Sequence, residues 1–274
     1  MDAETVNLEL ELLIQAIFTK FQYDFRNYSR SSLRRRLDQC QIKYNVKTIT
    51  EIQYKLLHEA DFFPKLLAYL TVNTTEFFRD PEYFLNIREK VAPFLKTFPS
   101  LKIWVAGCST GEEVITLSIL LKEAGLKKFL IYATDLNPMN LEVAKRGIYQ
   151  ADTIKKASHN YQLSGGKTSF SDYFSLSYDS VKFHESVLEN VVFSDHSLST
   201  DSVFSEMHFV SCRNVLIYFD RILQDRVLTL FKDSLVRNGF LGLGNKETIQ
   251  FSGIRDDFTV IDQENRIYQK KISS

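Results

Sequence analysis

The chain of 274 residues is long enough for one large domain or two modest ones, and its 34 basic and 34 acidic residues give a formal net charge of zero. This balance argues against a protein whose main role is to bind the nucleic-acid backbone. No apolar run approaches the roughly 20 residues needed to cross a bilayer. The three cysteines are far apart and the first residues are polar and acidic, so we expect a cytoplasmic protein without disulfides, signal peptide or metal site.

The first part of the chain has helical periodicity throughout. Apolar residues recur at spacings of three and four in Leu10–Phe21 and again in Leu33–Tyr44, which is typical of one buried helix face. The segment Thr48–Glu51 is a capping-box sequence that predicts the start of a third helix. Because Phe62–Leu70 continues the helical spacing, residues 1–75 are expected to form a small all-helical domain.

From residue 101 onward, short apolar runs alternate with helical stretches. The runs expected to form strands are Lys102–Ala106, Phe129–Thr134, Met207–Ser211 and Phe240–Leu243. The helices expected between them are Glu112–Glu123, Pro138–Gly147 and Asp220–Val236. Such alternation predicts an α/β domain over residues 76–274, with a doubly wound, mostly parallel sheet. Residues near 150–195 break the alternation and are expected to form an antiparallel insertion.

The segment Leu101–Glu113 predicts a strand, a tight turn and the start of a helix. The turn follows the carboxyl end of the strand, where open α/β sheets bind nucleotide-like ligands, and Gly107 and Gly111 let backbone approach a ligand closely. Glu112 and Glu113 would repel a pyrophosphate at this helix start. They favour a cofactor with positive charge, such as S-adenosylmethionine with its sulfonium and ammonium groups.

An acid stands at the end of the second expected strand. In a nucleotide-binding α/β fold, a carboxylate such as Asp135 accepts hydrogen bonds from the ribose hydroxyls. The alternative is that Asp135 merely helps to start the following helix, but Asn137 is the better N-cap and would leave Asp135 free for a ligand. A dinucleotide enzyme is the competing interpretation, although the Gly-x-Gly-x-x-Gly pattern is absent.

Two further segments, Asn73–Asp80 and Cys212–Phe219, place polar residues beside apolar ones. Together with the motifs above, they resemble the CheR-type chemotaxis receptor methyltransferases. The matching segments are Tyr23–Leu37, Asn73–Asp80, Gly107–Glu113, Ala133–Asn137 and Cys212–Phe219, which span nearly the whole chain in the family's order. The resemblance implies an S-adenosylmethionine-dependent protein-glutamate O-methyltransferase that modifies chemoreceptors and tunes chemotaxis adaptation. It also implies a helical N-terminal domain, a Rossmann-like methyltransferase domain and a small antiparallel subdomain inserted in the latter.

The resemblance assigns roles to individual positions. Asn73, Thr75, Arg79, Gly107, Asp135, Ser197, Leu198, Asn214 and Val215 are expected to bind the cofactor, with Asp135 on the ribose. Either Glu112 or Glu113 should contact the cofactor, and the sequence leaves open which. Ser197 replaces the asparagine of a His-Asn-Leu pattern, which puts its side-chain contact in doubt. Tyr218 should approach the reacting methyl group, and Arg79 or Tyr218 should orient the incoming carboxylate.

The expected reaction needs no catalytic base. A glutamate carboxylate is already ionised near neutral pH and can attack the sulfonium methyl directly, which leaves S-adenosylhomocysteine as the product. The enzyme would act mainly by holding the reacting atoms in line. A hydroxyl or amine substrate would instead demand a base, and the sequence displays no clear His/Asp pair for that purpose.

Basic residues outnumber acidic ones between Lys20 and Lys47. The candidates for docking a substrate are Arg30, Arg34, Arg35 and Arg36. Receptor methylation segments are acidic helices, so the cytoplasmic helical domain of a chemoreceptor would be steered to such a surface. The alternative is that these side chains form a solvated helix face, or that some of them pack against the catalytic domain.

Two other functions stay open at the level of sequence. One is a relative that keeps the cofactor site but acts in a different signalling array or only senses the cofactor. The other is a nucleic-acid methyltransferase, which the zero net charge and the short basic stripe disfavour. We expect a monomer that neither binds nucleic acid nor inserts into a membrane.

Overall fold

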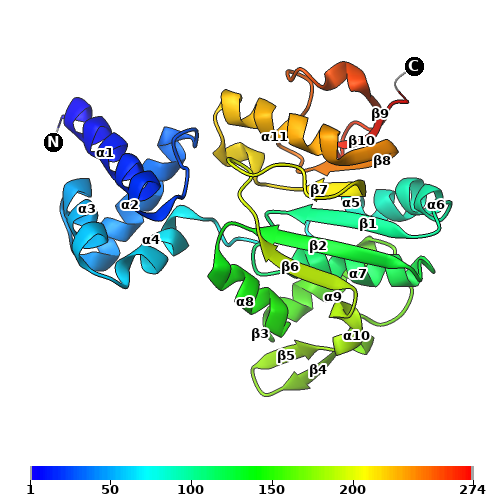
Figure 1. Cartoon of the computed structure of the whole chain (residues 1–274). Coiled ribbons are helices and arrows are strands. Elements are labelled where there is room, and N and C mark those ends of the chain that lie inside the picture. Colours follow the sequence, from blue (N-terminus) through cyan, green and yellow to red (C-terminus); the bar gives the residue numbers. More distant parts are fainter. Residues whose placement is uncertain (1, 273–274) are drawn as a thin grey trace. The chain divides into compact units, whose positions relative to one another are not determined.

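The structure is a computed structural model that describes residues 2–272. The chain divides into two compact units (Figure 1). The first unit contains the chain up to Val72 together with Leu198–Asp201 and Tyr218–Val227. The second contains Asn73–Ser197, Ser202–Ile217 and the chain from Leu228 onward. Two short segments from the second half of the sequence therefore belong to the N-terminal unit, which the sequence pattern did not indicate.

The first unit is helical, as predicted. Its helices are α1 (Ala3–Phe21), α2 (Arg30–Tyr44), α3 (Ile49–His58) and α4 (Phe62–Leu70). Their apolar faces meet in a core in which Leu13, Leu33 and Leu66 are almost inaccessible to solvent. The capping prediction at the third helix is confirmed, because the Thr48 hydroxyl accepts a hydrogen bond of 3.1 Å from the Glu51 N–H.

The added segments join the first unit through backbone hydrogen bonds. The Ser29 N–H donates to the Tyr218 carbonyl at 2.8 Å, and the Asp220 N–H donates to the Asn27 carbonyl at 2.9 Å. The Tyr28 ring also packs edge-on against Phe219, with the ring centroids 4.9 Å apart. These contacts fix the segment from Tyr218 onward as part of the helical unit.

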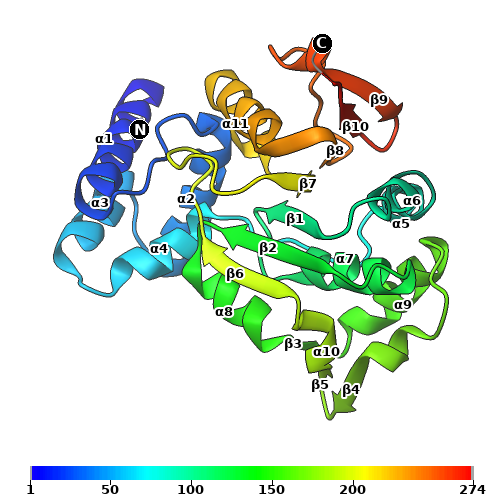
Figure 2. The ribbon, with the colours of Figure 1, turned by 45° about the vertical axis from the view of Figure 1, so that its right-hand side comes forward.

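The second unit is built on a large sheet. Its strands are β1 (Leu101–Ala106), β2 (Phe129–Asp135), β6 (Val191–Asp195), β7 (Met207–Cys212), β8 (Leu235–Leu243), β9 (Phe258–Asp262) and β10 (Ile267–Lys270). Among the described residues they run in the order β6-β2-β1-β7-β8-β10-β9 (Figures 1 and 2). The first five are mutually parallel, and β10 is antiparallel to both of its neighbours. The predicted mostly parallel sheet is confirmed.

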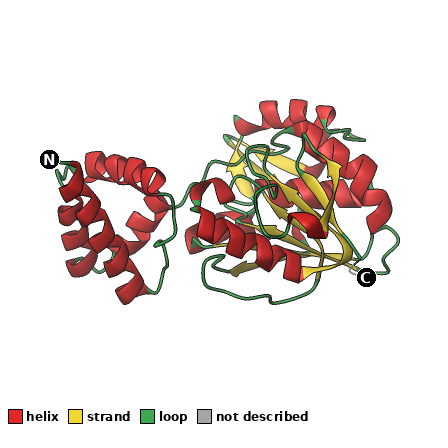
Figure 3. Cartoon of the chain, turned by 90° about the horizontal axis from the view of Figure 1, so that it is seen from above, coloured by secondary structure: helices red, strands yellow, loops and turns green. Residues whose placement is uncertain are grey.

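Helices cover both faces of this sheet (Figure 3). They are α5 (Pro81–Asn86), α6 (Ala92–Leu95), α7 (Glu112–Glu123), α8 (Pro138–Arg146) and, from Leu228 onward, α11 (Arg221–Ser234). A π-helical turn, η1 (Ile87–Val91), joins α5 to α6. The sheet and α7 enclose the main core, where Ile103, Ile131 and Leu117 are fully buried. No helix within the described part of the chain is both long and apolar enough to span a bilayer.

The insertion is antiparallel, as predicted, but its composition and limits differ from the expectation. It contains β3 (Ile148–Gln150), α9 (Thr153–Leu163), η2 (Phe170–Tyr173), β4 (Phe174–Ser177), β5 (Ser180–Phe183) and α10 (Glu185–Leu188), with strand order β3-β5-β4. The helix α9 was not predicted. The end of the expected range is β6, which belongs to the large sheet; its edge position leaves Val192 and Ser194 exposed and hides the apolar pattern of a parallel strand.

A buried ion pair ties the insertion to the rest of the unit. Arg88 on η1 and Glu123 on α7 lie 2.6 Å apart, and their side chains are only 8% and 5% exposed. The Tyr173 hydroxyl donates to the Glu123 carboxylate at 2.7 Å, and the Tyr161 hydroxyl donates to the same oxygen. One carboxylate therefore connects two aromatic residues of the insertion with the helical layer of the sheet.

Candidate functional site

Several of the predicted cofactor residues lie at or just after the ends of strands of the large sheet. Gly107 follows β1, Asp135 ends β2, Cys212 ends β7 and Leu243 ends β8. Because these strands are mutually parallel, their carboxyl ends lie at the same edge of the sheet. The loops at this edge form the candidate site.

The glycines of the loop after β1 are required by the protein's own packing. Gly107 and Gly111 have φ of +74° and +95°, a region that favours glycine. A Cβ at Gly107 would lie 2.5 Å from a methyl group of Val215, and one at Gly111 would lie 2.7 Å from the Cβ of Ala144. The space beside these glycines is thus filled by neighbouring side chains, whereas the sequence suggested that it serves the approach of a ligand.

Asp135 is buried and already hydrogen-bonded. Its carboxylate accepts from the Ser109 N–H at 2.8 Å, the Asn137 N–H at 2.9 Å and the Asn140 side-chain amide at 3.1 Å. Asn137 caps α8 as expected, since its side chain accepts from the Met139 N–H, but Asp135 also has three partners within the chain, which the sequence did not indicate. A carboxylate offers about four acceptor positions, so one is left for a ligand hydroxyl. Burial raises the pKa of Asp135, and these three hydrogen bonds partly offset that rise.

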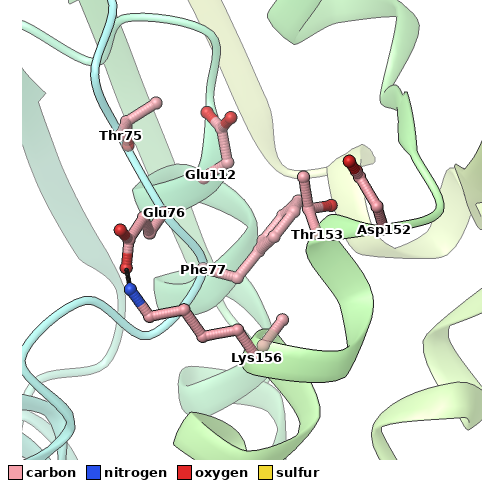
Figure 4. A pocket seen from close by; sticks show the side chains of 8 residues that line it. Thr75, Glu76, Phe77, Glu112, Asp152, Thr153 and Lys156 are labelled. Atoms are coloured by element: carbon pink, nitrogen blue, oxygen red, sulfur yellow. Dashed lines mark ion pairs between the residues drawn. The ribbon is translucent and has the colours of Figure 1, made fainter.

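The two adjacent acids at the start of α7 have different surroundings, and Glu112 faces a cavity. The cavity measures about 240 Å³ and is lined by Thr75, Glu76, Phe77, Glu112, Asp152, Thr153, Lys156 and Ala157 (Figure 4). The Glu112 carboxylate accepts from the Thr110 hydroxyl at 2.8 Å. Burial raises the pKa of Glu112, although this hydrogen bond acts against the rise.

Glu113 is engaged in a network within the protein. Its carboxylate accepts from the Ser211 hydroxyl at 2.6 Å and pairs with Arg213 at 3.2 Å. Arg213 also pairs with Asp80 at 2.7 Å and lies over the ring of Tyr83, 4.2 Å from its centroid. The charge of Glu113 is therefore balanced by the chain itself, which leaves Glu112 as the acid better placed for a ligand.

The segment Asn73–Asp80 approaches the same edge of the sheet. The Asn73 side-chain oxygen accepts from the Asn140 amide at 2.9 Å, and the same amide donates to Asp135, so one side chain links two predicted cofactor residues. Arg79 is half-buried and donates to the Thr74 carbonyl at 3.1 Å. Phe77 and Phe78, which precede Arg79, are core residues. The structure thus brings Asn73 and Asp135 together and places Thr75 at the cavity beside Glu112.

Asn214 and Val215 follow β7 and are held by a residue that the sequence analysis missed. The buried carboxylate of Glu247 accepts from the backbone N–H groups of both, at 2.9 and 2.8 Å. Val215 in turn packs against Gly107. The position of Glu247, four residues after the end of β8 at the same edge of the sheet, is a signal that could have identified it.

Tyr218, Ser197 and Leu198 fall on both sides of the division between the units. Ser197 is half-buried in the second unit, whereas Leu198 and Tyr218 belong to the first. The Tyr218 ring lies under the guanidinium of Arg36, 4.4 Å from centroid to carbon. The roles of these three residues toward a cofactor or a reacting methyl group stay predictions.

The four arginines predicted to dock a substrate are not equivalent. Arg35 is exposed and Arg34 is half-buried, whereas Arg30 forms an ion pair of 2.7 Å with Glu11. Arg36 is only 5% exposed; it donates to the Leu70 carbonyl and to the Ser32 hydroxyl. The prediction that Arg36 lies on an accessible docking surface is therefore wrong. Its guanidinium donates hydrogen bonds within the protein and packs against the Tyr218 ring.

The three cysteines of the chain are thiols that lie away from solvent. Cys40, Cys108 and Cys212 are buried and unbonded, and burial raises the pKa of each thiol, to about 11 for Cys40. Across residues 2–272, no cluster of three or more His, Cys, Asp or Glu side chains could hold a metal ion.

Comparison with known proteins covers both units. A family model described as "CheR methyltransferase, SAM binding domain" matches residues 73–267, and one described as "CheR methyltransferase, all-alpha domain" matches residues 8–71. The chain is 48% identical to "Putative methyltransferase Cher3" of Pseudomonas putida, over 96% of this chain and 97% of that protein. It is 28% identical to "Chemotaxis protein methyltransferase" of Listeria innocua, over 82% and 84% of the two chains. A protein of the same name from Borreliella burgdorferi is 27% identical over 88% of each.

Proposed function

The chain belongs to the CheR methyltransferase family, and from that premise we propose that it transfers methyl groups from S-adenosylmethionine to glutamate side chains of chemoreceptors. The S-adenosylmethionine-dependent methyltransferase class follows from the family, and chemotaxis is the process named for its relatives. The glutamate substrate and the roles of individual residues are the proposal. The observation that carries it is the Glu112 carboxylate, which lines a cavity at the carboxyl edge of the sheet.

The residues at this edge fit the proposed cofactor. A buried carboxylate attracts a cationic group strongly, and Glu112, unlike Glu113, has no cation of the chain within ion-pair distance among the described residues. Asp135 keeps one acceptor position for a ribose hydroxyl. The cavity beside Glu112 is smaller than the roughly 300–1,000 Å³ typical of ligand pockets, so it would hold only part of the cofactor.

The residues of the chain would act by positioning rather than by proton transfer. When bound, S-adenosylmethionine supplies a methyl group on a cationic sulfur, which is an electrophile for a carboxylate. A substrate glutamate is ionised near neutral pH, so no side chain of the site has to remove a proton. Alignment of reacting groups can contribute roughly 7–11 kcal/mol in favourable systems. Either Arg79 or Tyr218 is proposed to orient the substrate carboxylate.

The proposed partner is the acidic helical domain of a chemoreceptor in the cytoplasm. The exposed Arg35 and the half-buried Arg34 on α2 present positive charge without an ion pair to an acidic side chain among the described residues. Complementary charge of this kind steers association and fixes register. The docking surface consists of Arg34 and Arg35. Arg30 would join it only if its ion pair with Glu11 were broken.

Methyl transfer to a receptor fragment tests the function directly. The protein is incubated with labelled S-adenosylmethionine and the cytoplasmic fragment of a chemoreceptor, and the product is treated with base. A glutamate ester releases its label as methanol, whereas an N-methyl group does not. Base-stable label, or transfer to nucleic acid instead of the fragment, would overturn the proposal.

Reversal of the docking charges is expected to lower the rate of receptor methylation at least tenfold, because complementary surface charge speeds the association of enzyme and receptor. The loss should be smaller at high salt, because dissolved ions screen the attraction between exposed charges. The variant is Arg34→Glu with Arg35→Glu, assayed by initial rates at limiting receptor concentration. Cofactor affinity should stay unchanged. The matched control is Lys127→Glu with Lys128→Glu, which reverses two adjacent exposed charges outside the surface. Equal losses in both double variants would argue against a docking role.

Removal of the Glu112 charge is expected to weaken S-adenosylmethionine binding about tenfold, because a charge-assisted contact is lost. Burial raises the pKa of Glu112, so wild-type affinity should fall as the pH drops below neutral, and at a higher pH than it would for an exposed glutamate. Glu112→Gln should flatten this dependence without loss of stability, since the buried charge is itself a cost that disappears when the group is neutral. Calorimetry across pH measures both effects. Glu113→Gln, the control, should lower stability instead; a larger affinity loss there would reverse the assignment.

A further inference from the structure

Glu247 is a buried carboxylate that is compensated by backbone groups alone. It is 4% exposed, and its two oxygens accept four backbone N–H bonds of 2.7–2.9 Å, from Gly244, Asn214, Val215 and Leu216. No Lys, Arg or His among the described residues lies within ion-pair distance of it. Two donors per oxygen fill the acceptor capacity of a carboxylate, so the group is fully used as an acceptor.

The four donors come from two loops that are distant in sequence. Three are consecutive residues after β7, and the fourth belongs to the loop after β8. Consecutive N–H groups can converge on one anion when the chain turns sharply, and Asn214 provides the turn with a left-handed φ of +60°. A Cβ at Gly244 would lie 2.8 Å from the Asn214 nitrogen, so the two loops are in close contact around the carboxylate.

The loop that Glu247 holds is connected to the glycine loop after β1. The N–H of Val215 binds Glu247 on one side, and a methyl group of Val215 fills the space beside Gly107 on the other. A displacement of Val215 would therefore change the packing against Gly107 in the glycine loop. Through this chain of contacts one carboxylate fixes the loops after β1, β7 and β8 relative to one another.

We propose that Glu247 is a positioning residue for cofactor binding, which holds Asn214 and Val215 in place without touching the cofactor itself. The inference rests on the function proposed above, because it takes these two residues to be cofactor contacts. A carboxylate suits this role because it presents only acceptors to four donors. An amide of the same shape would direct an NH2 group at two of the N–H groups and would leave them unpaired.

The decisive variant is therefore Glu247→Gln, which keeps size and changes only the acceptor pattern. Backbone amide exchange at Asn214, Val215 and Leu216 should accelerate at least tenfold, because buried donors that lose their acceptor are strongly destabilised. The affinity for S-adenosylmethionine and S-adenosylhomocysteine should fall by about tenfold or more for the same reason. Exchange in β4 and β5, which are remote from Glu247 in the topology, should not change.

Controls separate this role from a general loss of stability. Glu264→Gln removes the same charge from an exposed position between β9 and β10 and should change neither exchange nor affinity. Glu247→Asp keeps a carboxylate with a shorter reach, so its affinity should lie between those of the wild type and Glu247→Gln, and it serves as the test if the latter does not fold. Unchanged amide exchange and affinity in the folded variant would overturn the inference. Absence of cofactor binding by the wild type would overturn the proposed function instead. The exchange measurement would still test whether Glu247 fixes the backbone of residues 214–216.

Discussion

Replacement of Asp135 by alanine is expected to reduce the affinity for S-adenosylmethionine by roughly 10- to 150-fold, the equivalent of the 1.5–3 kcal/mol of a hydrogen bond to a charged group. Two effects act in the same direction. The variant loses the acceptor proposed for a ribose hydroxyl, and it releases the Ser109 N–H and the Asn140 amide, which the carboxylate now holds. The glycine loop and α8 would therefore lose a shared contact.

Calorimetry with S-adenosylmethionine, at a temperature where the variant is folded, measures the Asp135 effect. Asp135→Asn separates the two contributions, because it keeps the side-chain shape and one acceptor oxygen. Its affinity should lie between those of the wild type and the alanine variant. Glu142→Gln removes an exposed acid from the following helix, α8, and should leave binding unchanged. Wild-type affinity in a folded Asp135→Ala protein would exclude this residue from the cofactor site.

Replacement of Glu123 by alanine is expected to lower the free energy of unfolding by about 3–5 kcal/mol, because it leaves the Arg88 guanidinium buried without its partner. The hydroxyls of Tyr161 and Tyr173 would lose their acceptor at the same time. Urea denaturation followed by circular dichroism measures the loss. The double variant Arg88→Met with Glu123→Leu is the control and should be far less destabilised, since apolar residues can replace a buried pair.

The same ion pair predicts a pH dependence of stability. Burial would raise the pKa of Glu123, but the hydrogen bonds from Tyr161 and Tyr173 and the charge of Arg88 outweigh it and lower the pKa. A carboxyl with a lowered pKa contributes stability above its unfolded value and loses that contribution as pH falls through the folded value. The acid-induced loss of stability should thus be smaller in the double variant than in the wild type. Equal acid sensitivity in the two proteins would contradict this account.

The general architecture could be predicted because it depends on patterns that are local in sequence. Alternating apolar runs and helices specify a parallel sheet, and the acid after β2 and the glycines after β1 then fall at one edge by topology alone. The two edge strands, β6 and β9, were missed for a physical reason. Edge strands bury only part of their side chains, so Val192 and Val260 are exposed and the apolar pattern weakens.

The detailed partners within the site depend on contacts that no local pattern encodes. Helical spacing predicts that Leu33 and Leu37 are buried, but Arg36 lies beside that apolar stripe, where a long side chain can turn inward to a carbonyl. Likewise, the positions of Glu112 and Glu113 are adjacent, yet only the fold determines that Arg213 meets the second of them. Glu247 was missed because its four donors come together only after β7 and β8 have paired.

Tyr218–Val227 belongs to the helical unit although it lies far along the chain from α1–α4. The N-terminal domain is therefore not a contiguous module that could be excised or transplanted by a single cut near Val72. A chimera that exchanged only residues 1–72 with a relative would combine Asn27 and Ser29 of one parent with the Tyr218–Asp220 backbone of another. Swaps of specificity between family members should therefore carry the Leu198–Asp201 and Tyr218–Val227 segments along with the N-terminal helices.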